Sequence, residues 1–211
     1  MWYRSLEAAI MPLRCVFCGT KTTEPEGFVC AGCADDLPRA PSPPPAAGSP
    51  LEFDIAPMAY AFPIDAAVKA LKFRRRLYYA PGLSQLLRDA VRELPDDIDA
   101  VLPVPLHWRR RWYRGFNQAV EIGKPIAKQL GVPLVKTVRR KRATPFQSGL
   151  SARQRASNLK SAFVVRGSLK HQHVLIVDDV ITTGTTMRTV ARALKSAGVE
   201  RVSALALARA V

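Results

Sequence analysis

The chain has 211 residues, of which 48% are hydrophobic, and its 32 Lys and Arg against 17 Asp and Glu give a formal net charge of +15. This length allows one substantial core and a small appended module, and the composition is that of a globular protein and excludes a disordered or fibrous one. No stretch reaches the ~18 uncharged apolar residues of a transmembrane helix, and residues 1–15 make a poor signal peptide. We therefore expect a cytoplasmic protein without membrane insertion.

The positive charge is concentrated in one part of the chain. Residues 99–160 contain fourteen Lys and Arg but only two acids, Asp99 and Glu121, and so carry +12 of the +15. A positive balance alone is common in Arg-rich proteomes. A cluster of this size favours polyanionic partners such as nucleic acid, phosphorylated metabolites or an anionic membrane surface.

All four cysteines lie in residues 1–37 and form two CxxC pairs, at Cys15, Cys18, Cys30 and Cys33. Two such pairs offer four thiolates from tight turns, which predicts a tetrahedral Zn²⁺ site. A redox site is less favoured because thioredoxin-type sites use one CxxC, and a disulfide is less favoured in the cytoplasm. Four thiolates leave no open position for water, so we expect the zinc to be structural.

The sequence PRAPSPPPAAGSP at residues 38–50 is dominated by Pro and small residues and predicts an extended linker. The predicted organisation is therefore a four-cysteine zinc module at 1–37, the linker, and one larger domain at 51–211.

The larger domain begins with a predicted strand at 53–62, broken by Pro57. Helical spacing follows at 83–94, with Ser84 as a candidate N-cap. A short buried strand is predicted at 99–105, where it stops at its prolines.

The middle of the domain contains a predicted helix at 116–130 with a kink at Pro125. A further strand is predicted at 132–138. The basic segment 139–162 lacks a clear apolar period and is predicted to be a long loop with some helix.

The last part of the chain gives the clearest signals. A buried strand is predicted at 173–180, a helix at 185–198 closed by Gly198, and a final strand at 202–208. Because strands alternate with helices, we predict an α/β fold with a mostly parallel sheet covered by helices on both faces.

The stretch VLIVDDVITTGTT, residues 174–186, combines a buried strand, an acid pair and a Thr/Gly loop. The carboxylates of Asp178 and Asp179 can accept hydrogen bonds from a vicinal diol. Loop amides and a helix N-terminus can hold a phosphate. The loop is formed by Thr182, Thr183, Gly184, Thr185 and Thr186. We interpret the stretch as a sugar-phosphate site.

Other readings of this stretch explain less of it. There is no GK[ST] of a P-loop and no Rossmann fingerprint. A receiver-type acid pair would account for the two carboxylates but not for the Thr-rich loop. A plain strand–turn–helix junction would not need five Thr and Gly residues.

VDDVITTGTT closely resembles the phosphoribosylpyrophosphate-binding motif of type I phosphoribosyltransferases. In that family the two acids bind the ribose hydroxyls and the following loop binds the 5′-phosphate. The resemblance implies Mg²⁺, a substrate that is phosphoribosylpyrophosphate or a ribose phosphate, and an α/β fold with a central parallel sheet.

A second resemblance covers nearly the whole chain. The four cysteines, LKF at 71–73, PVPLHWRRRWYRGFNQ at 103–118, QSGLSARQRASNL at 147–159 and the acid-pair motif occur in the order typical of the ComF family. That family joins a zinc segment to a phosphoribosyltransferase domain and is associated with DNA uptake in natural transformation. The resemblance implies a helicase-like DNA-uptake ATPase as a partner.

The same resemblance assigns further site residues. It makes the segment after the 99–105 strand a pyrophosphate loop, in which Arg109 and Arg114 are the expected ligands. It directs Lys72 toward the same anion site, although a surface lysine is an equal alternative from sequence alone. It makes 139–160 a loop that closes over the substrate and contributes Arg153.

Two functions of different kinds follow. The first is an enzyme that transfers a phosphoribosyl group. The second is a nucleic-acid-binding adaptor of DNA uptake, whose arginines and aromatic side chains around residues 108–116 contact single-stranded DNA. A sensor of phosphoribosylpyrophosphate without turnover is a third. Both acids are present, although an adaptor needs neither, so we favour retained phosphoribosylpyrophosphate binding.

Overall fold

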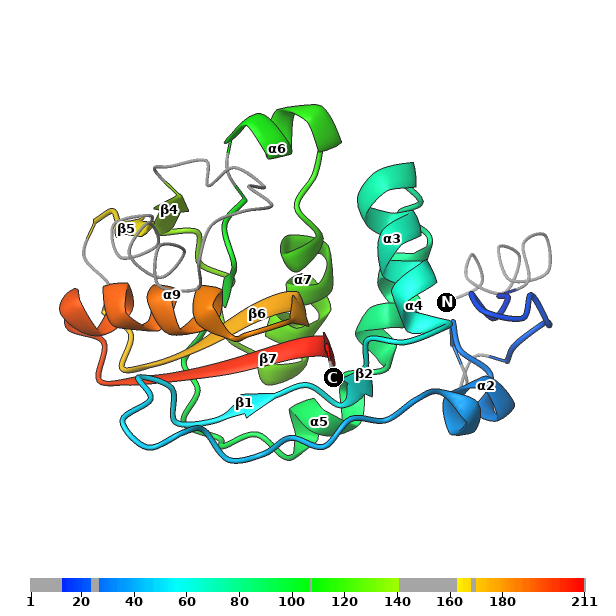
Figure 1. Cartoon of the computed structure of the whole chain (residues 1–211), viewed down its shortest axis with the longest axis horizontal. Coiled ribbons are helices and arrows are strands. Elements are labelled where there is room, and N and C mark those ends of the chain that lie inside the picture. The colour runs from blue at the N-terminus through cyan, green and yellow to red at the C-terminus, as the bar shows by residue number, and fades with distance from the viewer. Residues whose placement is uncertain (1–12, 24–26, 107, 141–162, 168–169, 211) are drawn as a thin grey trace.

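A parallel sheet forms the centre of the molecule (Figure 1). The computed structural model describes residues 13–23, 27–106, 108–140, 163–167 and 170–210, with only the backbone at 109–111. The strand order is β1-β7-β6-β3, and β2 pairs with β7 beyond β1. The strands are β1 Asp54–Ile55, β2 Met58–Ala59, β3 Ala100–Pro103, β6 His173–Ile181 and β7 Arg201–Arg209.

The long central strands form where the sequence has unbroken apolar runs. In β6 and β7 nearly every residue is buried, because the strands are covered on both faces. Ile176 of β6 lies beside Leu102 of β3 and beside Ala204 of β7, all in parallel register. The predicted strands at 99–105, 173–180 and 202–208, and the parallel sheet itself, are confirmed.

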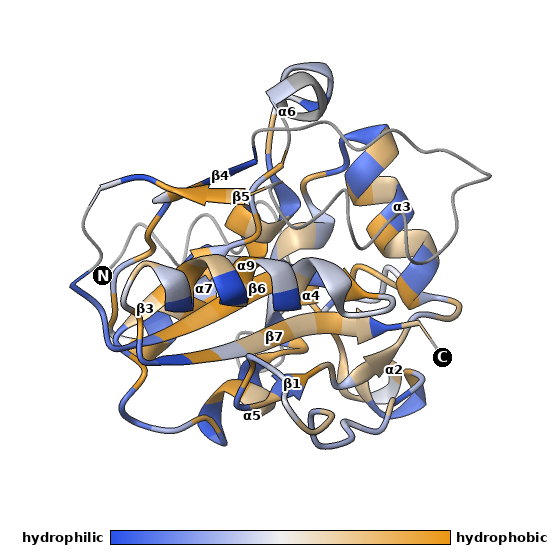
Figure 2. Ribbon diagram, turned by 60° about the vertical axis from the view of Figure 1, so that its left-hand side comes forward, coloured by the Kyte–Doolittle hydropathy of each residue, from blue (hydrophilic) through white to orange (hydrophobic). Residues whose placement is uncertain are grey.

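Two hydrophobic clusters cover the two faces of the sheet, and the alternation along β6 divides its side chains between them. Leu175 and Val177 belong to one cluster, and Val174 and Ile176 to the other. Figure 2 shows the apolar colouring of these strands beneath the helices. The first cluster is built with α3 Ile64–Arg74, α4 Tyr79–Gln85, α5 Arg88–Arg92 and α7 Gln118–Leu130, the second with α9 Thr185–Ser196.

The first half of the domain differs from the prediction in one helix. The broken strand at 53–62 is confirmed, since β1 and β2 lie on either side of Pro57. The predicted helix at 83–94 is instead two short helices, α4 and α5. Ser84 is not an N-cap, because it lies within α4, where its hydroxyl donates to the carbonyl of Ala80 at 2.9 Å.

Helix α7 confirms the prediction for 116–130, including Pro125 inside the helix. The strand predicted at 132–138 is wrong. Leu134 makes only an isolated bridge to Val101, and the chain then leaves the sheet. It forms β4 Val138–Arg140, which pairs antiparallel with β5 Phe163–Val165 in a separate two-stranded sheet.

Besides α2 Ala31–Asp36 in the cysteine segment, two helices of the larger domain lie where none was predicted. The expected pyrophosphate loop contains α6 Trp108–Arg114, so this part of the segment is helical. Helix α3 also lacked a sequence signal, because LKF was noted only as a motif. The predicted loop at 139–162 lies outside the described residues from 141 onward. The helix predicted to close at Gly198 ends at Ser196.

The cysteine segment packs against helix α4 and contains the short helix α2 Ala31–Asp36. The side chain of Gln85 accepts a hydrogen bond from the Phe28 amide at 2.7 Å and donates to the Val29 carbonyl at 3.3 Å. Gly82 allows the close approach, because a Cβ there would lie 2.7 Å from Val16 Cγ2. The segment is therefore joined to the larger domain through one face of α4.

The residues predicted as a linker contain neither helix nor strand, yet their first part is bound to β2. The Ala59 amide donates to the Pro38 carbonyl at 2.8 Å, and the Ala40 amide donates to Pro57 at 3.0 Å. The boundaries at residues 37 and 50 stay a prediction. Among the described residues, no helix is long and apolar enough to cross a membrane.

Candidate functional site

The acid pair lies at the C-terminal end of β6, where the sheet meets helix α3 (Figure 1). Asp179 is 5% exposed, and its Oδ1 lies 2.7 Å from the Nζ of Lys72 on α3. Asp178 is partly exposed, and its Oδ1 accepts a hydrogen bond from the Asp179 amide at 2.9 Å. Lys72 was expected to face this site, and its contact with the acid pair agrees with that expectation. Its role toward a ligand stays a prediction.

The two carboxylates are electrostatically unequal. Desolvation, followed by repulsion from Asp179, raises the pKa of Asp178 to about 7. The positive charges of Lys72 and Arg140 oppose this rise but do not cancel it. Carboxyl groups whose pKa is raised toward neutral pH in this way are common in ligand-binding and catalytic sites.

The Thr/Gly loop joins β6 to α9 and begins the helix. Gly184 is the N-cap residue with a φ of 68°, a left-handed conformation that favours glycine. The hydroxyls of Thr183 and Thr185 are hydrogen-bonded to each other at 2.8 Å. Thr182 and Thr183 are exposed, while Thr185 and Thr186 are partly buried in the first turn. The loop thus exposes the side chains of Thr182 and Thr183 between the strand that carries the acid pair and the start of α9.

Arg188, in the first turn of α9, is a residue beside the loop that sequence reasoning missed. Its guanidinium donates to the Thr183 carbonyl at 2.7 Å, and a Cβ on Gly184 would lie 2.7 Å from its Nη1. The sequence signal that could have identified Arg188 is its position four residues after Gly184, because residues four apart lie on the same side of a helix. Arg188 therefore adds positive charge beside the candidate phosphate loop.

The predicted pyrophosphate loop leaves β3 and returns at α7. Its two ends are held together by Asn117, which donates from Nδ2 to the Val104 carbonyl at 3.0 Å and caps α7 by accepting from the Ala119 amide at 3.2 Å. Between these ends, Arg114 donates to Gln118 Oε1 at 2.8 Å, and its guanidinium carbon lies 5.4 Å from the centre of the Phe73 ring.

Helices α3 and α6 meet above the strand ends. Arg75 donates to the Tyr113 carbonyl, and the Phe73 ring that contacts Arg114 is next in sequence to Lys72. Arg114 therefore contacts helix α3 at Phe73, the residue after Lys72. Arg109 lies on α6, where its side chain is not described, and Arg153 lies outside the described residues.

Arg140 is a second residue that sequence reasoning missed. It ends β4, and its charge acts on Asp178 from the side opposite α3. Its guanidinium carbon lies 5.5 Å from the centre of the Phe163 ring on β5. No sequence signal distinguished it from its basic neighbours, because β4 itself was not predicted.

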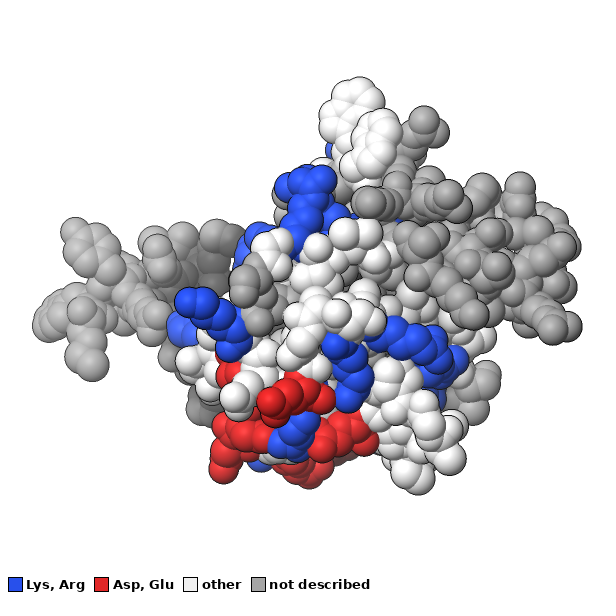
Figure 3. All heavy atoms as spheres, turned by 90° about the vertical axis from the view of Figure 1, so that its left-hand side faces the viewer, with Lys and Arg blue, Asp and Glu red and all other residues white. Residues whose placement is uncertain are grey.

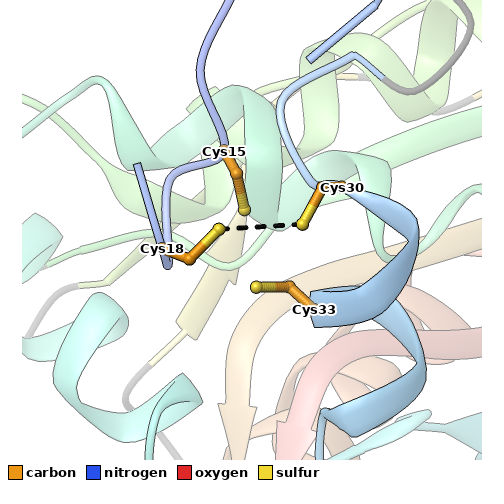
Figure 4. A group of neighbouring side chains, drawn as sticks. All are labelled: Cys15, Cys18, Cys30 and Cys33. Carbon is orange, nitrogen blue, oxygen red and sulfur yellow. Dashed lines mark hydrogen bonds between the residues drawn. The ribbon is translucent and has the colours of Figure 1, made fainter. Parts of the chain in front are cut away.

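The four cysteines converge in the N-terminal segment that packs against α4 (Figure 4). Their Sγ atoms all lie within 4.8 Å of one another, and Cys18 Sγ is 3.7 Å from Cys30 Sγ. A tetrahedral site with bonds of ~2.3 Å has sulfur–sulfur edges of about 3.8 Å. The cysteines are therefore positioned to bind a metal ion.

The thiols of this cluster differ in acidity. A hydrogen bond from the Thr20 side chain is the largest cause that lowers the pKa of Cys18, to about 6. Desolvation, followed by the neighbouring thiols, raises the pKa of Cys33. Four thiols this close cannot all ionise without a cation between them.

The fold and the loop after β6 define a domain of the phosphoribosyltransferase class. The family model described as "Phosphoribosyl transferase domain" matches residues 117–210, which contain α7, β6, the acid pair, α9 and β7. The sheet is parallel and its acids lie at the C-terminal strand ends, where ligands bind in open α/β sheets. The predicted type I phosphoribosyltransferase fold with an N-terminal four-cysteine segment is confirmed.

The chain belongs to the ComF family. It is 37% identical over 163 residues to "Competence protein F" of Haemophilus influenzae, a match that covers 72% of this chain and 70% of that protein. It is 40% identical over 159 residues to "DNA utilization protein YhgH" of Escherichia coli K12, covering 71% and 69%.

A solved structure, glutamine phosphoribosylpyrophosphate amidotransferase from B. subtilis complexed with ADP and GMP, aligns with a TM-score of 0.47 and 20% identity. The alignment covers 66% of this chain and 30% of that chain.

Proposed function

We propose that this protein binds phosphoribosylpyrophosphate or ribose 5-phosphate together with Mg²⁺ and transfers the phosphoribosyl group to an acceptor. The observation that carries the proposal is the position of the acid pair directly before the Thr/Gly loop that begins α9. Carboxylates accept hydrogen bonds from a vicinal diol, and a helix N-terminus binds phosphate. The two neighbours together suit a sugar phosphate.

The transfer breaks the bond between ribose C1 and the pyrophosphate oxygen, which keeps the electron pair, and forms a bond from C1 to the acceptor nucleophile. In our proposal Asp178 and Asp179 hold the ribose hydroxyls and residues 182–186 hold the 5′-phosphate. The leaving pyrophosphate is held by Lys72, Arg109, Arg114 and Arg153. Rate acceleration then depends on positioning and on cations that stabilise the departing charge.

The acid pair also fits a divalent cation. Mg²⁺ prefers hard oxygen ligands, and a raised carboxyl pKa beside a second carboxylate is what a bound cation relieves. When bound with the substrate, Mg²⁺ would neutralise charge on the pyrophosphate. Asp178 and Asp179 are the residues that would hold it, directly or through water.

Zinc is the metal that we propose for the cysteine cluster. Four thiolates at tetrahedral spacing suit Zn²⁺, and they leave no open coordination position, so the role is structural. The hydrogen bonds between Gln85 of α4 and the backbone of Phe28 and Val29 support a structural role, because a metal that orders the cluster would also hold this backbone against α4. Elemental analysis of the purified protein should find one zinc per chain.

We place this activity in DNA uptake or nucleotide metabolism, in the cytoplasm. Support comes from relatives named for competence and DNA utilization and from the net charge of +15. For the role in DNA uptake, the partners that we propose are single-stranded DNA and a helicase-like DNA-uptake ATPase.

The proposal is tested by calorimetric titration of phosphoribosylpyrophosphate with Mg²⁺. Wild type should bind saturably, and the Asp178→Ala, Asp179→Ala double variant should lose binding at least about 100-fold, because each carboxylate contributes a charge-assisted hydrogen bond. Circular dichroism should show that the variant is folded. Equal affinity in the two proteins would refute the site.

A second candidate is a non-catalytic adaptor that binds nucleic acid. It is favoured by Trp112 and Tyr113 on α6, which are 86% and 83% exposed beside Arg109–Arg111. Charge reversal at the three arginines should then reduce the salt dependence of oligothymidylate binding. An unchanged slope would mean that DNA does not follow α6.

A further inference from the structure

The side chain of Gln118 joins the end of helix α6 to the start of helix α7. Arg114 is the last residue of α6, and Gln118 is the first residue of α7. The guanidinium of Arg114 donates from Nη1 to Oε1 of Gln118 at 2.8 Å. The chain turns between them at Gly115, whose φ of 83° lies in the left-handed region that favours glycine. Gln118 therefore holds an arginine that comes from a different helix.

The hydrogen bonding of Gln118 is not that of a glutamine kept for stability. Its residue is 2% exposed, and its Nε2 is buried without a hydrogen-bond partner among the residues that the structure describes. A buried amide nitrogen without a partner destabilises a fold, and an apolar side chain of similar size would remove that penalty. Folding alone therefore does not explain a glutamine at this position.

The preceding residue, Asn117, shows what a structural amide looks like in the same segment. Both ends of its amide are paired with backbone, since Nδ2 donates to the Val104 carbonyl and Oδ1 accepts from the Ala119 amide. The side chain of Gln118 instead binds the functional group of Arg114. Asn117 thus fixes the backbone of the segment, and Gln118 fixes a cation at its end.

Helix α3 contacts the same arginine from a second direction. The guanidinium carbon of Arg114 lies 5.4 Å from the centre of the Phe73 ring. Phe73 follows Lys72, whose Nζ lies 2.7 Å from Oδ1 of Asp179. The five N–H donors of a guanidinium form a rigid fork, so the donor that binds Gln118 sets the direction of the others. Gln118 and Phe73 together therefore determine which way the guanidinium of Arg114 faces.

We infer that Gln118 is a positioning residue, which orients Arg114 toward the leaving pyrophosphate. The inference rests on the function proposed above, in which Arg114 is a pyrophosphate ligand, and it adds a residue to that site. In this role Gln118 acts through Arg114 and does not touch the substrate. A guanidinium that is already oriented loses less rotamer freedom when the pyrophosphate binds, so the binding is tighter.

The test is calorimetric titration of the full-length protein with pyrophosphate and Mg²⁺, and separately with ribose 5-phosphate. Arg114→Ala should weaken pyrophosphate binding about tenfold or more, because it removes a charge-assisted contact. Gln118→Met keeps the volume of the side chain but not its acceptor, and should weaken pyrophosphate binding about fivefold. Ribose 5-phosphate lacks the leaving group, so its affinity for Gln118→Met should stay within about twofold of that for wild type.

Two further measurements separate positioning from a structural role. Because Gln118 acts through Arg114, the double variant Arg114→Ala, Gln118→Met should bind pyrophosphate within about twofold of Arg114→Ala alone. Gln118→Met should melt at the same temperature as wild type or higher, since it removes the unpartnered amide and water can bind the partly exposed Arg114. The matched control is Gln129→Met, the same change at an exposed position of α7, which should leave pyrophosphate affinity unchanged.

The outcomes distinguish this inference from the proposed function. Equal pyrophosphate affinity in Gln118→Met and Gln129→Met would overturn the inference alone. So would additive losses from Arg114→Ala and Gln118→Met, a lower melting temperature of Gln118→Met, or an equal loss of both ligands in that variant. A wild type that binds neither pyrophosphate nor ribose 5-phosphate would overturn the proposed function, and the inference with it.

Discussion

Both ends of the central sheet carry polar and charged side chains, but the two ends differ in how completely these side chains are paired. Where β6 and β7 begin, His173 is 1% exposed, and its Nδ1 lies 3.0 Å from Asp97 and its Nε2 2.9 Å from the Ser203 hydroxyl. Arg201 nearby is bound by Glu52 at 2.8 Å and also by Asp97. Figure 3 shows the acidic side chains gathered on this end, with Lys and Arg mainly above them.

The arrangement of Ser203, His173 and Asp97 has the connectivity of a hydrolase triad, yet it has no access to a substrate. Ser203 is fully buried in β7, so an acyl group cannot reach its hydroxyl. Both ring nitrogens of His173 and the Ser203 hydroxyl have hydrogen-bond partners within the protein. At this end of the sheet, polar side chains therefore stabilise the fold.

At the opposite end the side chains compensate one another incompletely. Asp178 and Asp179 are adjacent, one of them has a raised pKa, and the lysine that compensates the pair contacts only Asp179. The exposed hydroxyls of the Thr/Gly loop lie next to them. Mutual pairing therefore marks the structural cluster, and incompletely compensated charge marks the candidate binding site.

The largest effect on stability should come from His173→Ala. The substitution leaves a cavity between β6 and β7 and removes the partner of the buried Ser203 hydroxyl, so we expect a loss of about 3 kcal/mol in unfolding free energy. Chemical denaturation measures it. Ribose 5-phosphate affinity of the folded variant should be unchanged. Weaker binding with unchanged stability would reverse the roles that we assign to the two ends.

Asp179→Asn should affect both properties. Lys72 would keep a charge in a partly buried position without its partner, at a cost of about 2 kcal/mol, and ribose 5-phosphate binding should be lost. Asp89→Asn is the control, because its pair with Arg92 is 67–85% exposed and should contribute less than about 0.5 kcal/mol. Similar destabilisation by both substitutions would argue against a special role of the Lys72 pair.

Binding of ribose 5-phosphate should depend on pH through Asp178. With its pKa raised to about 7, this carboxyl is largely protonated at pH 6 and ionised at pH 8, and the ionised form accepts the ribose hydroxyls. Affinity should therefore rise up to about tenfold over this range. The ligand phosphate also titrates near pH 6, so Asp178→Asn supplies the baseline. An identical pH profile in the variant would exclude Asp178 as the titrating group.

Much of the fold could be predicted because the buried strands correspond to local patterns in the sequence. The runs 173–180 and 202–208 are apolar without interruption, and the acid pair and loop follow directly in sequence. The four-cysteine cluster was also readable from spacing alone. These features need no knowledge of distant contacts.

The features that local sequence patterns did not predict depend on distant contacts. Lys72, which only the family resemblance directed to the site, reaches Asp179 from a helix without a clear start or stop signal. Arg140, which was missed, acts on Asp178 only because β4 leaves the central sheet to pair with β5. Helix α6 lies in a run of arginines without an apolar period, so the local pattern gave no helix there, and the loop that we expected came from the family resemblance. Tertiary packing, and not propensity, decided these segments.

Thermal unfolding of Asp178→Asn against wild type, with and without Mg²⁺ and ribose 5-phosphate, tests the central claim most directly. The pKa of Asp178 is raised in the folded protein from an ordinary value of 3.8 to about 7, so its ionisation destabilises the fold progressively as pH rises from about 4 to 7.

We therefore predict that the variant melts at a higher temperature than wild type at pH 8, at nearly the same temperature at pH 4, and gains less stability from the ligand at pH 8 than wild type does. A variant that is less stable at pH 8, or that is stabilised by the ligand as wild type is, would contradict a site in which folding stability is given up for binding.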